Sequence, residues 1–182
     1  GNVSSVTLIL NGTTDQSVSG TIDGIDASNI YVRNTGANTT TTFNDVIGGN
    51  QTVGSLTVAD GDTTLAANAT FSGVVRINAD TLTNNSGATL TANRIDGVGT
   101  FVNAGTADVA STLPVSTVTN TGTLNVGSDV SGNVTNSGTL DVTGNFAGAS
   151  TLTNQSGGTA TIGGNFSSNA TIDNAGTLTL KD

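Results

Sequence analysis

The chain has 182 residues, with 25 Gly, no Cys, His, Met or Trp, and 13 acidic residues against four basic ones, so its net charge is −9. Four dispersed cations cannot form the basic surface that nucleic acid or an anionic membrane requires, so we expect neither partner. No apolar run approaches the ~20 residues of a membrane-spanning helix, and the lack of His and Cys excludes the commonest nucleophile–base pairs and metal sites.

Charged residues make up only 9% of the chain and hydrophobic ones 34%. Thr and Val, which favour strands, alternate with Gly, Asn and Asp, which favour turns. Every acidic residue is Asp, and strong helix formers such as Glu and Lys are scarce. The composition therefore predicts an all-β protein with almost no helix.

The first part of the chain, residues 1–80, contains the less regular elements. The segments "LILNG" (Leu8–Gly12) and "VRNTG" (Val32–Gly36) each combine an apolar residue, an Asn and a Gly, which indicates a strand running into a corner. The segments "VGSLTVADG" (53–61) and "FSGVVRIN" (71–78) predict further strands. The separation of Asn34 and Asn84 is close to three of the later repeat units, so we expect both to occupy the same kind of corner.

Residues 81–182 repeat a regular Asn-x-Gly unit about every 18 residues. The repeated Asn residues are Asn84, Asn103, Asn120, Asn136, Asn154 and Asn174. Two positions before each Asn stands an apolar residue, namely Leu82, Phe101, Val118, Val134, Leu152 and Ile172. We expect the Gly that follows each Asn to supply a left-handed backbone conformation at the corner.

A second apolar pair follows each corner, with its members two residues apart, which is the period of a strand. Its leading residues include Leu124, Leu140 and Leu178. Two units have a turn that is longer by two residues, and an even insertion keeps the same side chains on the inward face. We therefore assign both apolar sets to the core.

A period of about 16–20 residues with two or three short strands is typical of a β-solenoid, in which each unit buries its apolar face only by stacking on the next. We predict one parallel β-helix over residues 1–182, with about ten rungs of roughly 16–20 residues each. Equivalent side chains would lie ~4.8 Å apart along the axis, so the six Asn residues would form a hydrogen-bonded ladder. The alternative is that these Asn residues line a carbohydrate site.

No residue set points to a reaction, and we expect no cofactor. Asp60 and Asp62, in the turn "ADGDTT", could help to bind Ca²⁺, although the EF-hand spacing fails because no closing Glu exists; a polar turn is the alternative. Arg76 and Arg94 could pair with Asp80 and Asp96 as a surface charge cluster of little energetic value.

The "VTNSGTLDV" type of unit, with "GNVTN" and "GTLTL" around it, resembles bacterial surface β-solenoids such as autotransporter passengers and filamentous-haemagglutinin-like exoproteins. The resemblance covers about residues 80 to 182 well and the earlier part loosely. It implies a secreted, right-handed parallel β-helix at the bacterial cell surface, used as a stalk or an adhesin. Those passengers are usually much longer than this chain.

Three functions follow from these patterns. The first is a structural subunit or segment of an extracellular fibre, in which uncapped solenoid ends, as we expect at both termini, stack end to end with other copies. The second is an adhesin segment that binds a glycan or another ligand on a host or neighbouring cell. The third is an enzyme acting on polysaccharides through Asp residues, which the scattered positions of the Asp residues disfavour.

Overall fold

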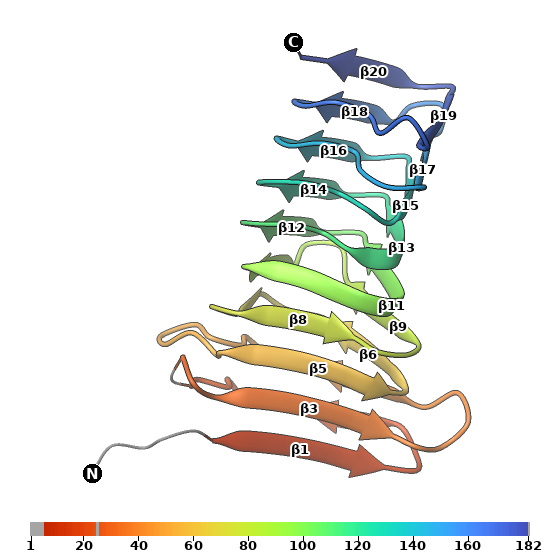
Figure 1. Ribbon diagram of the computed structural model, residues 1–182. Coiled ribbons are helices and arrows are strands. Elements are labelled where there is room, and N and C mark those ends of the chain that lie inside the picture. The colour runs from red at the N-terminus through yellow and green to blue at the C-terminus, as the bar shows by residue number, and fades with distance from the viewer. Residues whose placement is uncertain (1–5, 25, 182) are drawn as a thin grey trace.

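A computed structural model describes residues 6–24 and 26–181, and over these residues the chain forms strands and turns but no helix. The chain winds into a stack of coils whose neighbouring strands all pair in parallel, with strands β1 and β20 at opposite ends of the stack (Figure 1). One continuous path of paired strands runs from β1 to β19 and corresponds to about nine turns. The predicted parallel β-solenoid is confirmed; it has about nine turns rather than ten because the first coils are longer than the average repeat.

The strands lie on three faces of the stack, which we call faces A, B and C. Face A contains β1 (Thr7–Gly12), β3 (Asn29–Asn34), β5 (Ser55–Asp60), β8 (Val74–Ile77) and the first part of β11 (Arg94–Asn103). Face B contains β2 (Gln16–Val18), β4 (Thr40–Phe43), β6 (Asp62–Leu65), β9 (Thr81–Asn84), the second part of β11, β13 (Val115–Asn120), β15 (Asn133–Asn136), β17 (Thr151–Asn154) and β19 (Thr171–Asn174). Face C contains β7 (Ala69–Thr70), β10 (Thr89–Ala92), β12 (Thr106–Val109), β14 (Thr123–Val126), β16 (Thr139–Val142), β18 (Thr159–Ile162) and β20 (Thr177–Leu180).

Strand β11 is where the coil changes shape. Its first residues pair with β8 on face A, and its last four pair with β9 on face B. Between the two parts lies Gly97, with a φ of +120°, where an added Cβ would lie 2.1 Å from the carbonyl oxygen of Ile77. Beyond β11, face A is reduced to single-residue bridges that link Leu113, Val130, Phe146 and Phe166. In the first of these coils Pro114 follows Leu113 and has no N–H to donate, which limits the pairing there to one residue. The later coils have the same single bridge without a Pro.

The core is a column of inward side chains that are stacked in register from coil to coil. Seven of the nine residues predicted for it are at most 1% exposed, namely Leu82, Phe101, Val118, Val134, Leu152, Leu124 and Leu140. Ile172 and Leu178 depart from the prediction: Ile172 is 40% exposed and Leu178 is only half-buried. Both stand in register with the inward Leu152 and Ala160, but no coil within the described residues covers them from the other side.

The prediction that Asn34 and Asn84 share one kind of corner was wrong. Asn34 ends β3 and stands in register with Gly12, at the corner between faces A and B. Asn84 ends β9 and stands in register with Leu65, at the corner between faces B and C. A coil with strands on three faces has more than one corner, and the same turn chemistry serves at each of them.

Candidate functional site

The six repeated Asn residues form a ladder along the corner between faces B and C. In the first five of them, the side-chain Nδ2 donates to the Oδ1 of the Asn one coil later, at 2.8 Å for the first four steps and 2.7 Å for the last. The first five side chains are fully buried, whereas Asn174 is exposed. A buried chain of amides in which each member donates and accepts is strongly stabilising, because breaking one link leaves polar atoms without partners.

The ladder also fastens face B to face C. Asn120 Nδ2, for example, donates to the carbonyl oxygen of Gly122 in its own turn at 3.2 Å. It also donates to the carbonyl oxygen of Thr139, which begins the next strand on face C, at 2.8 Å. Each amide therefore holds the two strands that meet at the corner as well as the two coils.

The glycines at this corner are required for two different reasons, and the expectation of a left-handed backbone holds for only some of them. In the two longer turns, Gly87 and Gly157 have φ values of +83° and +88°. In the shorter turns Gly is required because no side chain has room: a Cβ on Gly122 would lie 2.0 Å from the carbonyl oxygen of Gly105. No side chain fits there because the coils stack so closely.

The ladder has a direction, so its two ends differ. Asn84 Oδ1 is buried and accepts no hydrogen bond within the described residues, because the apolar Leu65 occupies the position beneath it. Asn174 accepts from Asn154, but its own Nδ2 donates only to the Gly176 carbonyl oxygen of its turn, at 3.1 Å. Within the described residues, the last coil thus presents an unused amide donor.

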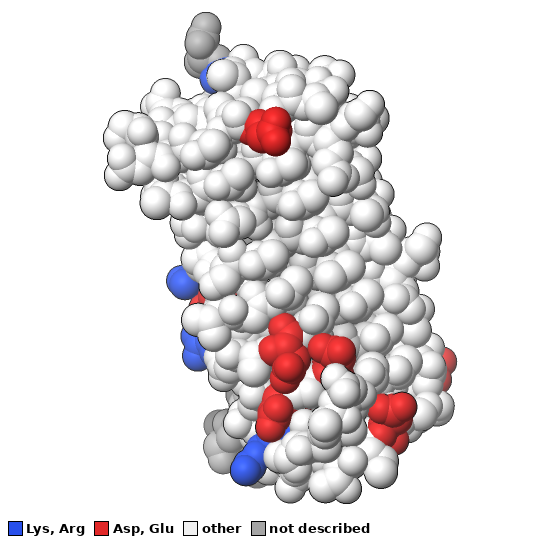
Figure 2. Space-filling model, turned by 90° about the vertical axis from the view of Figure 1, so that its right-hand side faces the viewer, with Lys and Arg blue, Asp and Glu red and all other residues white. Residues whose placement is uncertain are grey.

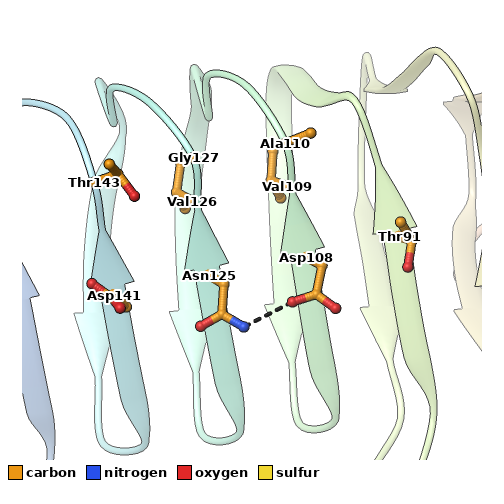
Figure 3. A pocket seen from close by; sticks show the side chains of 9 residues that line it. All are labelled: Thr91, Asp108, Val109, Ala110, Asn125, Val126, Gly127, Asp141 and Thr143. Carbon is orange, nitrogen blue, oxygen red and sulfur yellow. Dashed lines mark hydrogen bonds between the residues drawn. The ribbon is translucent and has the colours of Figure 1, made fainter.

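A row of polar side chains crosses a shallow hollow on face C. Asp108, Asn125 and Asp141 extend in the same direction from β12, β14 and β16, and Asn125 Nδ2 donates to Asp108 Oδ1 at 2.7 Å (Figure 3). The two carboxylates are two coils apart, or about 9.6 Å at the usual spacing of strands. The polar side-chain atoms of these three residues are oxygen acceptors except for the Asn125 Nδ2, which already donates to Asp108.

The candidate calcium ligands lie at the corner between faces A and B, where they connect coils. Asp62 Oδ1 accepts the backbone N–H of Thr81 at 3.0 Å, and Asp80 Oδ2 accepts that of Gly61 at 2.8 Å. Asp60, Asp62 and Asp80 line one hollow at this corner. In the described part of the chain, no group of three or more acidic, His or Cys side chains is arranged to hold a metal ion. Calcium binding by Asp60 and Asp62 therefore stays a prediction.

Arg76, Arg94 and Asp96 form one cluster on face A. Arg76 donates to both carboxylate oxygens of Asp96, at 2.9 and 3.2 Å, and Arg94 Nε lies 3.3 Å from the second oxygen. The hydrogen bonds and charge of Asp96 raise the pKa of Arg76. Asp80, which we had also placed in this cluster, binds the Gly61 backbone instead. The Asp96 carboxylate is 11% exposed, so the two guanidinium groups cover most of it.

Comparison with known proteins found no matching family model, no similar curated protein and no similar solved structure. The resemblance to autotransporter passengers and haemagglutinin-like exoproteins therefore rests on the periodicity and composition of the chain. No helix among residues 6–24 and 26–181 has the length and apolar character needed to cross a membrane.

Proposed function

We propose that the chain is a non-enzymatic structural rod, a subunit or segment of an extracellular fibre on a bacterial surface. The observation that carries the proposal is the Asn ladder, which runs through six successive coils beside a continuous apolar core. Bending or pulling the rod would break these buried hydrogen bonds together with the parallel strand pairs, so the coils resist deformation as a unit.

End-to-end association between copies is the assembly that we propose for the fibre. In the described part of the chain, β19 pairs only with β17 and β20 only with β18, so each has a free edge. Beside these edges the inward Ile172 and Leu180 are 40% and 53% exposed, and at the other end Leu8 of β1, which stands in register with the buried Ile30, is 37% exposed. Free strand edges beside apolar side chains favour pairing with another chain.

The two end coils differ in shape, which limits how copies can join. The first coil carries the six-residue strand β1 on face A, whereas the last coil has only the bridge at Phe166 there. A joint between copies would therefore use faces B and C, with β19 against β2 and β20 near Ile22.

Negative-stain electron microscopy of the 182-residue chain tests this proposal. We expect thin filaments whose axial repeat is about nine strand spacings, or roughly 43 Å. Ile172→Lys places a charge in the joint and should disperse the filaments, while Thr179→Lys, on the outward side of β20, should leave them intact. Short dispersed rods from the unchanged chain at high concentration would contradict end-to-end assembly, and turnover of uronic-acid polymers would contradict a non-enzymatic role.

An adhesin is the second candidate, favoured by the distribution of cations. Three of the four basic residues, Arg33, Arg76 and Arg94, lie on face A strands, and Tyr31 lies among them on β3. Arg76 and Arg94 share the single carboxylate of Asp96, so this pair keeps one net positive charge beside Arg33. An anionic glycan on a cell surface is the ligand that such a face would attract. Binding of sulfated or uronate glycans that Arg33→Glu removes and Lys181→Glu preserves would support this function; equal binding by both variants would contradict it.

A further inference from the structure

The outward side of face B is an array of threonines. The six strands from β9 to β19 on this face provide twelve outward positions in two rows, and nine of them are Thr. The first row includes Thr81, Thr100 and Thr117, and the second includes Thr119, Thr135 and Thr153. Val102, Asn133 and Asp173 are the exceptions, and Val102 has nearly the shape of Thr.

The array is regular in both directions. Thr100 pairs with Thr117, and Thr119 pairs with Thr135, which in turn pairs with Thr153. The register shift between β11 and β13 lies before Thr100, outside the array. The side chains therefore repeat at ~4.8 Å along the rod axis and at about 6.6 Å, twice the rise of a strand, across it. Because every strand of the array is paired on both sides except the last, the grid is held rigidly.

The array is also uncharged and has free hydroxyl groups. Between Asp62 on β6 and Asp173 on β19, the outward positions of face B carry no charge, in a chain whose net charge is −9. Figure 2 shows this as a white expanse between the acidic side chains near the two ends of the molecule. Within the described residues, the hydroxyls of Thr83, Thr119, Thr135 and Thr153 make no hydrogen bond.

A second copy of the chain and a neutral sugar chain both fit this face poorly. Six strands of four residues span about 13 by 24 Å, so two copies packed face to face would bury roughly 600 Å² in total, well below the ~1,200 Å² of a stable interface. A neutral sugar chain is normally held by aromatic rings or by a few fixed polar groups. The one aromatic side chain on these six strands, Phe101, is fully buried and points inward.

We propose that face B binds ice. Ice is an uncharged, rigid grid of hydrogen-bond donors and acceptors, and the oxygen atoms on the prism face of hexagonal ice repeat on a rectangular grid of similar dimensions. Each Thr offers a hydroxyl that can join the lattice and a methyl group around which water orders. Because the side chains stand on a preformed sheet and are β-branched, little conformational entropy is lost on binding. This inference requires only the solenoid and does not depend on fibre assembly.

Thermal hysteresis and the shape of growing ice crystals, measured on the 182-residue chain, test the proposal. We expect hysteresis and faceted crystals from the unchanged chain, and loss of both from Thr119→Lys in β13. The matched control is Thr123→Lys in β14, which makes the same change in the same coil but on face C. On that face the neighbouring outward row is interrupted by Asp108, Asn125 and Asp141, so face C does not offer an uncharged grid. The control should retain the activity.

Thermal unfolding by circular dichroism checks that both variants fold, and Thr135→Lys provides a second variant on face B if Thr119→Lys does not. Absence of hysteresis from the folded, unchanged chain overturns the proposal. Equal loss from the face B and face C variants, or loss from Thr123→Lys alone, also overturns the assignment to face B. A fluorescently labelled chain that is excluded from a slowly growing ice hemisphere would give the same negative answer independently.

Discussion

The coils before β11 and those after it stack in register in the same way but differ in length and in the number of strands per coil. In the first region Ile30 pairs with Leu56 one coil later, and each coil has strands on faces A and B. In the second region Val118 pairs with Val134 one coil later; these coils are shorter, and face A shrinks to single bridges. A coil can therefore gain or lose about ten residues without disturbing its neighbours, provided that the inward residues stay in register.

The corner between faces B and C shows the difference most clearly. At this position the first region has Phe43 and Leu65, which are buried and apolar, and the second has the Asn ladder that begins at Asn84. The first region also has a whole apolar column on face A, including Leu56 and Val75. Beyond β11, face A adds only single bridge residues such as Val130 and Phe146 to the core, while the ladder runs along the corner between faces B and C. The two regions should therefore respond differently to the same substitution.

The largest effect should come from a charge placed in the narrow second region. Val126 on face C is 1% exposed, so Val126→Asp buries an unpaired carboxylate in a core only two strands wide. We expect a loss of about 4 kcal/mol or more in the free energy of unfolding, enough to open the rod. Chemical denaturation measures it, and the outward change Thr123→Asp in the same strand, between Thr106 and Thr139, is the control. Unchanged unfolding of the Val126 variant would contradict the assigned core.

Breaking the ladder should have the next largest effect. Asn120→Leu gives a ladder position the side chain that the first region uses, and it removes both the acceptor for Asn103 Nδ2 and the donor to Asn136 Oδ1. We expect destabilisation by about 2–4 kcal/mol, because buried polar atoms lose their partners. Urea denaturation midpoints of this variant and of Thr119→Leu, a change at the adjacent outward position, are compared. The difference between them separates the contribution of the ladder from the general effect of placing Leu in β13. Equal midpoints would show that the ladder contributes little.

The reverse exchange sharpens the comparison. Leu65→Asn removes a buried apolar side chain but places an amide beneath Asn84 Oδ1, the acceptor that lacks a partner within the described residues. Leu65→Ala should cost about 3 kcal/mol from lost packing, and Leu65→Asn should cost about 1 kcal/mol less than that. The denaturation midpoints of the two variants show which substitution costs more stability. If Leu65→Asn is the more damaging change, the first region does not accept ladder chemistry.

A smaller effect is expected at the charge cluster where face A ends. Arg76→Ala leaves Asp96 with Arg94 as its remaining cation within the described residues. Because the Arg76 side chain is 53% exposed, we expect a loss of no more than about 1 kcal/mol, and less in high salt. Unfolding curves at two salt concentrations measure this. A large, salt-independent loss would mean that Arg76 acts through packing rather than charge.

The smallest effect should be a local response to acid in the first region. Asn50 donates its backbone and side-chain N–H groups to Asp23 at 2.9 and 2.8 Å, which lowers the pKa of Asp23 below its ordinary value of 3.8. A carboxyl with a lowered folded-state pKa stabilises the fold above its unfolded pKa, and that contribution is lost as the pH falls through the folded-state pKa. The Asn50 amide signal in NMR spectra should therefore be constant above about pH 5 and shift only below pH ~4. Asp23→Asn should abolish the shift.

Much of the architecture could be predicted because the repeat is strict after residue 80. In-register parallel stacking follows from three features of the repeat. An apolar residue stands two positions before each Asn, successive Asn residues are only about 18 residues apart, and the insertions in two turns are even in length. Asn34 was misplaced because "VRNTG" has the local chemistry of the later corners although it stands between faces A and B. The corner glycines also looked alike in sequence, although Gly122 is required by the Gly105 carbonyl oxygen of the preceding coil.

By itself, then, the sequence determined the strands, their inward faces and the parallel stack, because strand alternation and coil-to-coil identity are periodic properties that can be read along the chain. Only the tertiary structure decided how many faces each coil has, which corner an Asn occupies, and which polar groups have partners, such as Asp96 between two arginines. These features depend on atoms far apart in the chain that meet only when one coil lies on the next. The regular threonine grid on face B is of the same kind: its residues are ordinary in sequence, and stacking alone makes them a surface.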